Sequence, residues 1–456
     1  MSKRDFSERI LSGFWDIRRH EFGRALLLLL SLFVLLVSYY ILKTLREPMI
    51  LAASASDSAI LESGVLWSWV SDMLSMRGPY KRIVAAACQS FLLLFFVPVF
   101  SFVATRLHGY RLVFAVTVFF ILNLLYFGYA MFSGIAFTGF VFFIWVGIFS
   151  VAMVSLFWSY AADIYNDSDG KRIFPIIGIG ASLGAPLGAL AADGFIGASV
   201  SEWGIMGASV AGLVCFLVLI FIVERGVERG SRAVSESGTD SVSSRGGFMS
   251  VLRSPYLFSM AIVIMLLNLV NTTGEYILSE MVVAHAGELI AADGNLDERS
   301  VIGSLYANFY FWVNIVSFFL QAVVVSRLVK YAGMKSLIFL LPLICLGVYG
   351  FVAVGVGFVA MRWMKTAENS TNYSVMNTAR AMLFLVVSEG EKYKAKQAID
   401  TFFVRIGDMA AAFVVIVVGG GLQLGVRGIA FMNVGFVLLW LGVSWIMWRC
   451  YRVRVK

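Results

Sequence analysis

The sequence predicts an all-α membrane protein with twelve transmembrane helices in two six-helix halves. Of its 456 residues, 60% are hydrophobic and only 14% are charged, and the mean hydropathy is +0.85. Soluble domains contain about 45–50% apolar residues, so this composition is typical of a chain that crosses a membrane many times. Apolar segments of spanning length recur along the whole chain, and one long polar segment divides them into two groups.

The predicted helices cover residues 25–46, 83–105, 111–132, 138–163, 173–195, 204–223, 255–283, 302–327, 336–356, 359–388, 399–421 and 428–448. The segment 224–254 is rich in Ser, Gly and Arg and has no apolar period, so we interpret it as a flexible linker. It separates an N-terminal half, residues 1–223, from a C-terminal half, residues 255–456.

The basic residues indicate the orientation of the chain in the membrane. Most of the 36 Lys and Arg fall in the two termini, in the linker and in alternate loops, which predicts that both termini are cytoplasmic. The predicted outer loops contain only Arg77, Lys81, Arg82, Arg299 and Arg427. The net charge of +8 is therefore explained by the positive-inside rule, and we expect no binding to nucleic acid.

Several classes of site are excluded by the spacing of the residues that they need. The four cysteines and three histidines are scattered, so we expect no disulfide framework, no metal site and no cofactor. Gly178, Gly180, Gly184 and Gly188 superficially resemble a dinucleotide fingerprint, but no strand precedes them. Glycines every fourth residue instead predict that a neighbouring helix approaches closely. The chain has no phosphate-binding P-loop, so we predict a carrier and neither an ATP-hydrolysing pump nor another enzyme.

Charges within the apolar segments are the candidate functional residues, because each costs about 2.5–3.5 kcal/mol at the centre of a bilayer unless it has a partner or a wet cavity. The first helix ends with Lys43, Arg46 and Glu47. Either the two cations reach to the membrane interface, or they hold the phosphates of a substrate.

The seventh and eighth helices have polar stripes. Asn268, Asn271, Thr272, Thr273 and Glu275 predict a partly unwound, cavity-lining segment in the seventh helix, with hydrogen bonding between intact helices as the alternative. In the eighth helix, Tyr306, Tyr310 and Asn314 recur at spacings of four residues. These rings would suit either stacking on a nucleobase or packing between helices.

The charges are densest in the tenth and eleventh helices and the loop between them, on Lys365, Glu368, Asn372, Arg380, Lys394, Lys396, Arg405 and Asp408. The fourth helix adds Asp163. Structural ion pairs are the alternative for any one of these residues. As a set, the basic groups on the first, tenth and eleventh helices favour an anionic substrate.

The two halves resemble each other. A basic loop joins the second helix to the third and the eighth to the ninth, and Glu47 lies at the end of the first helix where Glu275 lies in the seventh. Two such six-helix repeats are typical of the major facilitator architecture, in which the substrate site lies at the midplane between the halves.

Long segments of the chain are similar to one family of carriers. The segments 365–374, 377–385 and 391–408 resemble the bacterial branch of the ATP/ADP translocase family, as do 42–47 and 171–175 more briefly. This resemblance implies nucleotide exchange across a bacterial inner membrane, by a protein that we expect to be a monomer. It assigns substrate contacts to Lys43, Asp163, Glu275 and the region of Lys394 and Lys396.

The alternatives to nucleotide exchange stay open at this stage. The chain has residues 404–408, Val-Arg-Ile-Gly-Asp, where the established exchangers have a Pro-Leu-Gly-Lys-Ser-type run. A proton-coupled carrier for another organic anion would use Asp163, Glu275 or Glu368 as its proton site. A membrane protein of the same fold that does not transport is the remaining alternative.

Overall fold

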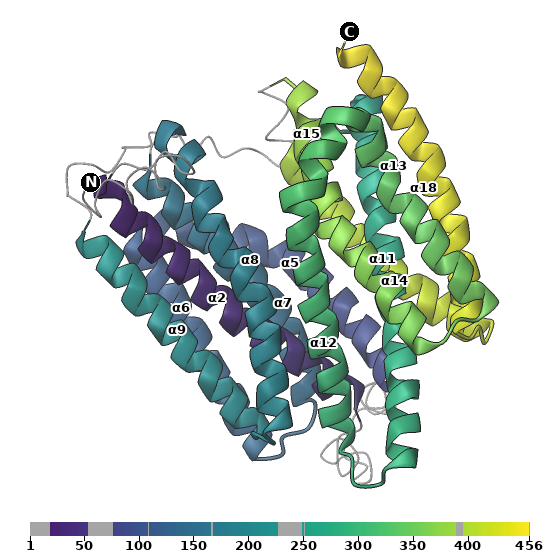
Figure 1. Ribbon diagram of the computed structural model, residues 1–456, viewed down its shortest axis with the longest axis horizontal. Helices are drawn as coiled ribbons and strands as arrows, with labels where there is room; N and C mark the ends of the chain where they lie inside the picture. Colours follow the sequence, from purple (N-terminus) through teal and green to yellow (C-terminus); the bar gives the residue numbers. More distant parts are fainter. Residues whose placement is uncertain are drawn as a thin grey trace, which may run out of the picture. The chain divides into compact units, whose positions relative to one another are not determined.

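A computed structural model describes residues 19–52, 76–107, 109–165, 167–226, 249, 251–388 and 395–455. Within these residues every regular element is a helix. The first part of the chain forms α2 (Arg19–Leu51), α5 (Gly78–Arg106), α6 (Tyr110–Phe132), α7 (Thr138–Ile164), α8 (Asp167–Gly197) and α9 (Glu202–Arg225). These six agree with the predicted positions, apart from their ends (Figure 1).

The second part begins with α11 (Pro255–Ala292) and α12 (Glu298–Phe319), which continues through the short π-helix η1 (Leu320–Val324) into α13 (Val325–Val354). It then forms α14 (Phe358–Thr371), η2 (Asn372–Met376), α15 (Asn377–Leu383) and η3 (Phe384–Val386). After a gap in the described residues come η4 (Ile399–Phe403), α17 (Val404–Phe413), η5 (Val414–Gly419) and α18 (Val426–Val455). Four of the five described η segments are π-helices, and η3 is a 3₁₀-helix. Three of the π-helices, η2, η4 and η5, lie within the predicted tenth and eleventh helices.

Ten of the described helical segments are long and apolar enough to cross a membrane. One of them, Glu298–Val354, has 57 residues, whereas a single crossing needs about 20. It is interrupted at Gly333, whose φ of 67° and ψ of −172° are not helical and belong to a region that essentially only glycine adopts. Segment 358–383 is too polar to count among the ten because it contains the buried charges described below.

The contacts divide the chain into two compact units. The first contains the described residues of Met1–Leu45, Val99–Thr138 and Val146–Gly238, and the second contains those of Arg46–Pro98, Gly139–Trp145 and Thr239–Lys456. The boundaries of the two predicted halves at residues 224–254 stay a prediction, since residues 227–248 lie outside the described part of the chain.

In the first unit the glycines of α8 bring two helices together. A Cβ atom on Gly180, Gly184 or Gly188 would collide with a backbone carbonyl of α2, at Leu29, Phe33 and Val37 respectively. The predicted close approach of a neighbouring helix is therefore confirmed, and its partner is α2. Within the same unit, α6 packs along α9.

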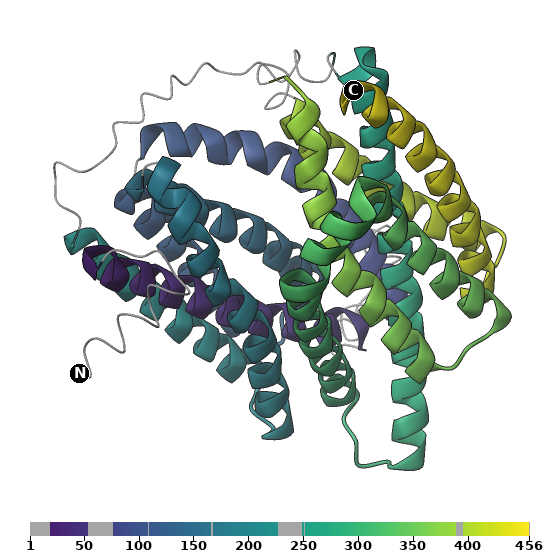
Figure 2. The same cartoon turned by 45° about the horizontal axis from the view of Figure 1, so that its top comes forward.

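In the second unit α11 is the central helix, with α17 and α18 packed against it. Figures 1 and 2 both show α18 alongside α13, which it also contacts. The prediction that the seventh helix is partly unwound is wrong, because α11 is continuous for 38 residues. Some of its polar side chains bond to their own helix: Asn268 Nδ2 donates to Ile264 O at 2.7 Å and Thr273 Oγ1 to Leu269 O at 2.8 Å. The alternative, hydrogen bonding between intact helices, is also observed, because Thr273 Oγ1 lies 2.7 Å from Asn433 Oδ1 of α18. Such bonds remove the need for an open backbone.

Candidate functional site

Glu47, near the end of α2, is fully buried and accepts hydrogen bonds from three side chains. Its Oε1 accepts from Arg46 Nε at 3.2 Å and from Tyr310 Oη at 2.9 Å. Its Oε2 accepts from Arg82 Nε at 2.7 Å. A buried carboxylate is stable only with such partners, so this side chain fixes the end of α2 to α5 and α12.

Arg82 joins Glu47 to a second carboxylate. Its Nη2 donates to Glu275 Oε2 of α11 at 3.1 Å, and the residue is only 6% exposed. The two glutamates that correspond between the halves of the sequence therefore bind one guanidinium group. The assignment of Arg82 to an outer loop is wrong: α5 begins at Gly78, not at residue 83, because the carboxylates allow its helix to start with buried charge.

Lys365 of α14 extends this arrangement on the other side of Glu275. Its Nζ lies 3.9 Å from Glu275 Oε1 and 2.7 Å from Glu368 Oε1, and the side chain is completely buried. Tyr349 Oη of α13 donates to Glu368, at 2.9 Å from Oε2. Asn369 Nδ2 donates to Glu275 Oε1 at 2.9 Å. Every carboxylate in this region thus has both a cation and a neutral donor.

Three cations and three carboxylates alternate along a continuous line, which we call the charge chain: Arg46, Glu47, Arg82, Glu275, Lys365 and Glu368. Its members come from α2, α5, α11 and α14, and their formal charges cancel. An added anion must therefore take a cation away from a carboxylate. Five of the six were predicted as substrate contacts from the sequence, and Arg82 was not.

The backbone of α11 is adapted to the charge chain at Gly274. A Cβ atom there would overlap the Tyr349 hydroxyl and would approach Lys365 Nζ. Any larger residue would push both groups away from Glu368. Glycine is thus required at this point by the close approach of side chains, and α11 remains helical through it.

The two tyrosines of α12 differ in their bonding. Tyr310 is committed to Glu47, as described above, whereas the buried Tyr306 hydroxyl has no hydrogen-bond partner among the described residues. The two rings lie 5.9 Å apart. Asn369 Oδ1 is likewise buried and unsatisfied within the described part of the chain. These two atoms are free to bond a ligand beside the charge chain. Asn314 Nδ2 donates to Tyr310 O, so this amide nitrogen bonds to the backbone of its own helix, α12.

Asp408 is the centre of a second polar cluster. Its Oδ2 accepts from Ser90 Oγ of α5 at 2.8 Å, and its Oδ1 accepts from Thr272 Oγ1 of α11 at 2.8 Å. Arg405 Nη1 lies 3.6 Å from Oδ2. The segment before Arg405 is the π-helix η4, and π-turns are frequent at functional sites. The predicted residues Arg405 and Asp408 therefore form an interhelical junction with α5 and α11.

Other predicted contacts lie elsewhere. Lys43 belongs to the first unit, where it is buried and its Nζ lies 4.9 Å from the centre of the Tyr40 ring. Asp163 is exposed at the end of α7 in that unit. Arg380 forms an ion pair of 2.6 Å with Asp400.

Asn372 opens the π-helix η2, one turn beyond Glu368, and is partly exposed. Lys396 is exposed, and Lys394 lies outside the described residues. The structure therefore assembles Arg46, Glu47, Glu275, Tyr310, Lys365 and Glu368, and it leaves the substrate roles of all the predicted residues as proposals.

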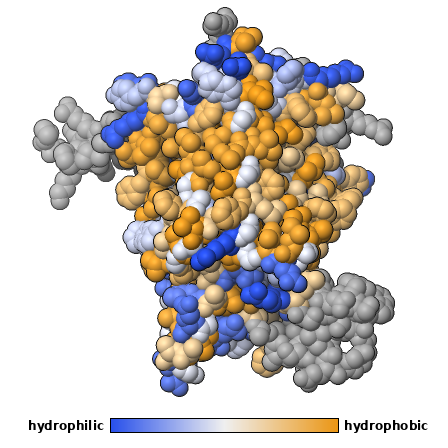
Figure 3. Space-filling view, turned by 90° about the vertical axis from the view of Figure 1, so that its right-hand side faces the viewer, coloured by the Kyte–Doolittle hydropathy of each residue, from blue (hydrophilic) through white to orange (hydrophobic). Residues whose placement is uncertain are grey.

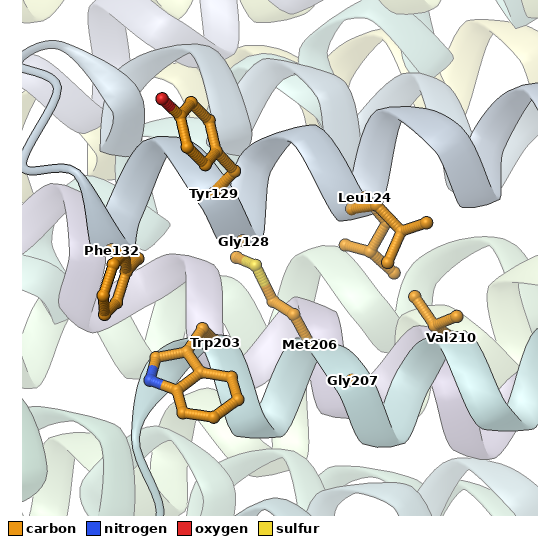
Figure 4. Close-up of a pocket in the computed structure, with 9 residues that line it drawn as sticks. Leu124, Gly128, Tyr129, Phe132, Trp203, Met206, Gly207 and Val210 are labelled. Atoms are coloured by element: carbon orange, nitrogen blue, oxygen red, sulfur yellow. The ribbon is translucent and has the colours of Figure 1, made fainter.

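An apolar pocket of about 450 Å³ lies between α6 and α9 in the first unit (Figure 4). Its lining includes Tyr129, Phe132, Trp203 and Met206, with Gly128 and Gly207 among them. None of its lining residues is charged. A pocket without charge cannot hold a multiply charged anion away from water, so it is not the candidate site.

The chain is similar in sequence to carrier proteins of known name. The chain is 22% identical to the ADP,ATP carrier protein 1 of Chlamydia muridarum, over 95% of this chain and 89% of that protein. It is 21% identical to the ADP,ATP carrier protein 1 of Chlamydia pneumoniae, over 89% and 86% respectively.

The fold is similar to that of solved transporter structures. An auto inhibited POT family peptide transporter has a TM-score of 0.62 and 10% identity, over 94% of this chain and 97% of that chain. The nucleoside transporter NupG has a TM-score of 0.60 and 12% identity, over 92% and 99%. These likenesses show the major facilitator type of all-helical membrane fold. The sequence pattern of the TLC ATP/ADP transporter family matches residues 1–283, which is well over half of this chain. The chain therefore belongs to that family.

Proposed function

We propose that this protein is a membrane carrier that exchanges nucleotides of the ATP/ADP type by alternating access. The observation that carries the proposal is the charge chain, in which three cations pair with three carboxylates and four of the six residues, Glu47, Arg82, Lys365 and Glu368, are buried. Membership of the TLC ATP/ADP transporter family and the likeness to ADP,ATP carrier proteins support the choice of nucleotide. Arg46, Arg82 and Lys365 are the cations that we assign to the phosphates.

Phosphate oxygens suit these cations for a physical reason. Arginine binds two oxygens of a phosphate with parallel hydrogen bonds, and lysine adds a compact charge. Within the charge chain the same groups are satisfied by carboxylates, so a phosphate binds only by replacing them. The Tyr306 hydroxyl and Asn369 Oδ1 are available to the remainder of the substrate.

The same competition explains exchange. Separating α2 and α5 from α11 and α14 breaks the ion pairs of Arg82, and leaving such buried charges unpaired costs about 3–5 kcal/mol. A bound nucleotide offers the cations other partners during the movement, which lowers this cost. The loaded carrier therefore reorients faster than the unloaded one, as strict exchange requires.

The first alternative is a proton-coupled carrier for another organic anion. It needs a carboxyl group that gains and loses a proton, and Glu275 is poorly suited because it lies between Arg82 and Lys365. The second alternative is a membrane protein of this fold that does not transport. Neither an enzymatic activity nor a resident cofactor is part of the proposal.

The finer architecture is also a proposal: twelve spans in two halves, in the inner membrane, as a monomer with both termini cytoplasmic. The break at Gly333 and the buried charges of α14 support counting Glu298–Val354 as two spans and the segment from Phe358 as another. A cysteine in place of Ser201, in a background without the native cysteines, should react with an impermeant thiol reagent outside intact cells. Protection of this cysteine in intact cells, with labelling after lysis, would contradict the orientation.

Proteoliposomes test exchange directly. Vesicles loaded with unlabelled ADP should take up labelled ATP much faster than empty vesicles, and a protonophore should change the uptake little. Equal uptake into empty vesicles that a protonophore abolishes would favour the proton-coupled carrier. Absence of uptake in both, by protein that melts cooperatively, would favour the protein that does not transport.

A further inference from the structure

The paired helices α13 and α18 carry positive charge without any negative charge. Neither helix contains Asp or Glu. Apart from Arg427 at the start of α18, their basic residues gather near the start of α13 and at the end of α18: Arg327, Lys330, Lys335, Arg449, Arg452 and Arg454. The two groups meet, because Lys335 of α13 lies against rings of α18.

Three of these basic residues and two tryptophans of α18 form one cluster, the cation–aromatic patch: Lys335, Trp445, Trp448, Arg449 and Arg452. Lys335 Nζ lies 5.0 Å from the centre of the Trp448 ring and 5.7 Å from that of Trp445. Arg449 lies over Trp445 at 5.4 Å and Arg452 over Trp448 at 4.2 Å, each four residues after its ring. The two rings are 5.1 Å apart. Three cations are thus held against two indoles.

The three cations of the patch are exposed and have no carboxylate partner among the described residues. Arg454 shows the contrast, since its Nη2 donates to Ser254 Oγ at 3.0 Å and its guanidinium lies over Tyr256. Cation–π contacts orient a cation without cancelling its charge. The patch is therefore an ordered group of three positive charges that remains open to an anion.

The surroundings of the patch are those of a membrane interface. Below it, α18 exposes Leu438, Leu439 and Ile446, each 55% exposed. Figure 3, which looks onto the side of the molecule at the right of Figure 1, shows a broad apolar band with hydrophilic residues gathered beyond both ends of it. Tryptophan is enriched where such a band meets the headgroups, since its ring is apolar and its N–H is polar.

We propose that the cation–aromatic patch binds the phosphate-bearing headgroup of an anionic phospholipid, with the acyl chains lying along the exposed apolar side of α18. Basic groups between helices at a membrane surface bind such headgroups. The patch and the charge chain share no residue, so this lipid site is separate from the nucleotide site that we propose. It fixes α13 and α18 at one leaflet, at the end that we propose to be cytoplasmic.

The test uses the full-length protein released from nanodiscs that contain phosphatidylglycerol and phosphatidylcholine, with bound lipid counted by native mass spectrometry. The test variant is Arg449→Gln with Arg452→Gln. The matched control is Arg106→Gln with Arg225→Gln, which also removes two exposed cations at helix ends. Each of these control residues lies over one phenylalanine ring, at 4.7 and 4.3 Å respectively. Lys335→Gln tests the contribution of α13 separately.

Wild-type protein should retain phosphatidylglycerol in preference to phosphatidylcholine. Each basic residue near a membrane surface contributes about 1 kcal/mol to anionic-lipid binding, so the test variant should bind phosphatidylglycerol on the order of 10- to 30-fold more weakly. The control should stay close to wild type, and Lys335→Gln should lie between them. Equal losses in test and control variants would overturn the proposal, because they would indicate general charge attraction. Displacement of the lipid by millimolar glycerol phosphate would also overturn it, since the site would then recognise a soluble phosphate.

Discussion

Replacing Arg82 by glutamine is expected to destabilise the protein severely and to abolish exchange. Within the described residues, Arg82 is the cation that bonds both Glu47 and Glu275, and Glu47 is completely buried. Removing one partner from a buried ion pair costs about 3–5 kcal/mol, because the remaining charge stays in a medium of low dielectric constant. We expect a large fall in melting temperature in detergent and no detectable uptake in loaded proteoliposomes.

Two further variants separate the role of Arg82 from a general loss of charge. Arg82→Lys keeps the charge, but a single ammonium group does not reproduce the guanidinium contacts to both glutamates, so its effect should be intermediate. Arg77→Gln is the matched control: Arg77 also bonds a glutamate, Glu280, at 2.8 Å, but its side chain is 68% exposed. Exposed pairs contribute about 0–1 kcal/mol. Similar melting temperatures for Arg82→Gln and Arg77→Gln would contradict a central role for Arg82.

Lys365→Gln is expected to have the second largest effect. Lys365 is fully buried and donates to Glu368. Without this lysine, the buried Glu368 carboxylate keeps the hydrogen bond from Tyr349 but loses the cation that balances its charge. We therefore expect low yield and a lowered melting temperature, as for Arg82→Gln. Adding Glu368→Gln removes the uncompensated carboxylate, and a pair of amides can hydrogen-bond in the same place. The double variant should thus regain stability, measured by its melting temperature, yet still exchange nucleotide poorly because a phosphate ligand is missing.

Much of the fold was predictable because the bilayer restricts it to helices of known length. The positions of α6, α7 and α9 follow directly from their apolar length. The glycines of α8 also predicted a close helix contact correctly, since only small residues permit it. The apolar pattern could not predict the non-helical backbone of Gly333. It also placed the start of α5 at residue 83, after a charged segment that the helix in fact includes from Gly78.

The candidate site was predictable in its members more than in its connections. A buried charge must have a partner, which singled out Glu47, Glu275, Lys365 and Glu368. The identity of the partner depends on the tertiary structure. Nothing in the local sequence indicates that Arg82 lies between two glutamates that are 35 and 193 residues away. The available signal was that Arg82 directly precedes an apolar helix and fits its first turns.

Neutral donors were harder still to recognise. Tyr349 and Asn369 are ordinary helix residues until α13 and α14 bring them to Glu368 and Glu275. The unwound segment expected in α11 was wrong for a related reason. Asn268 and Thr273 bond to carbonyls one turn earlier, an outcome that sequence cannot distinguish from an opened helix.

The central claim is that phosphates replace carboxylates on the cations of the charge chain, and nucleotide binding by the Lys365→Gln, Glu368→Gln double variant tests it most directly. Isothermal titration with ADP and with adenosine would be compared between this variant and the wild type, after both are shown to melt cooperatively. A lost hydrogen bond to a charged group costs about 1.5–3 kcal/mol, so ADP should bind on the order of 10- to 100-fold more weakly while adenosine binding stays unchanged. If ADP bound the double variant as tightly as it binds the wild type, Lys365 and Glu368 would be a structural ion pair and the account would be wrong.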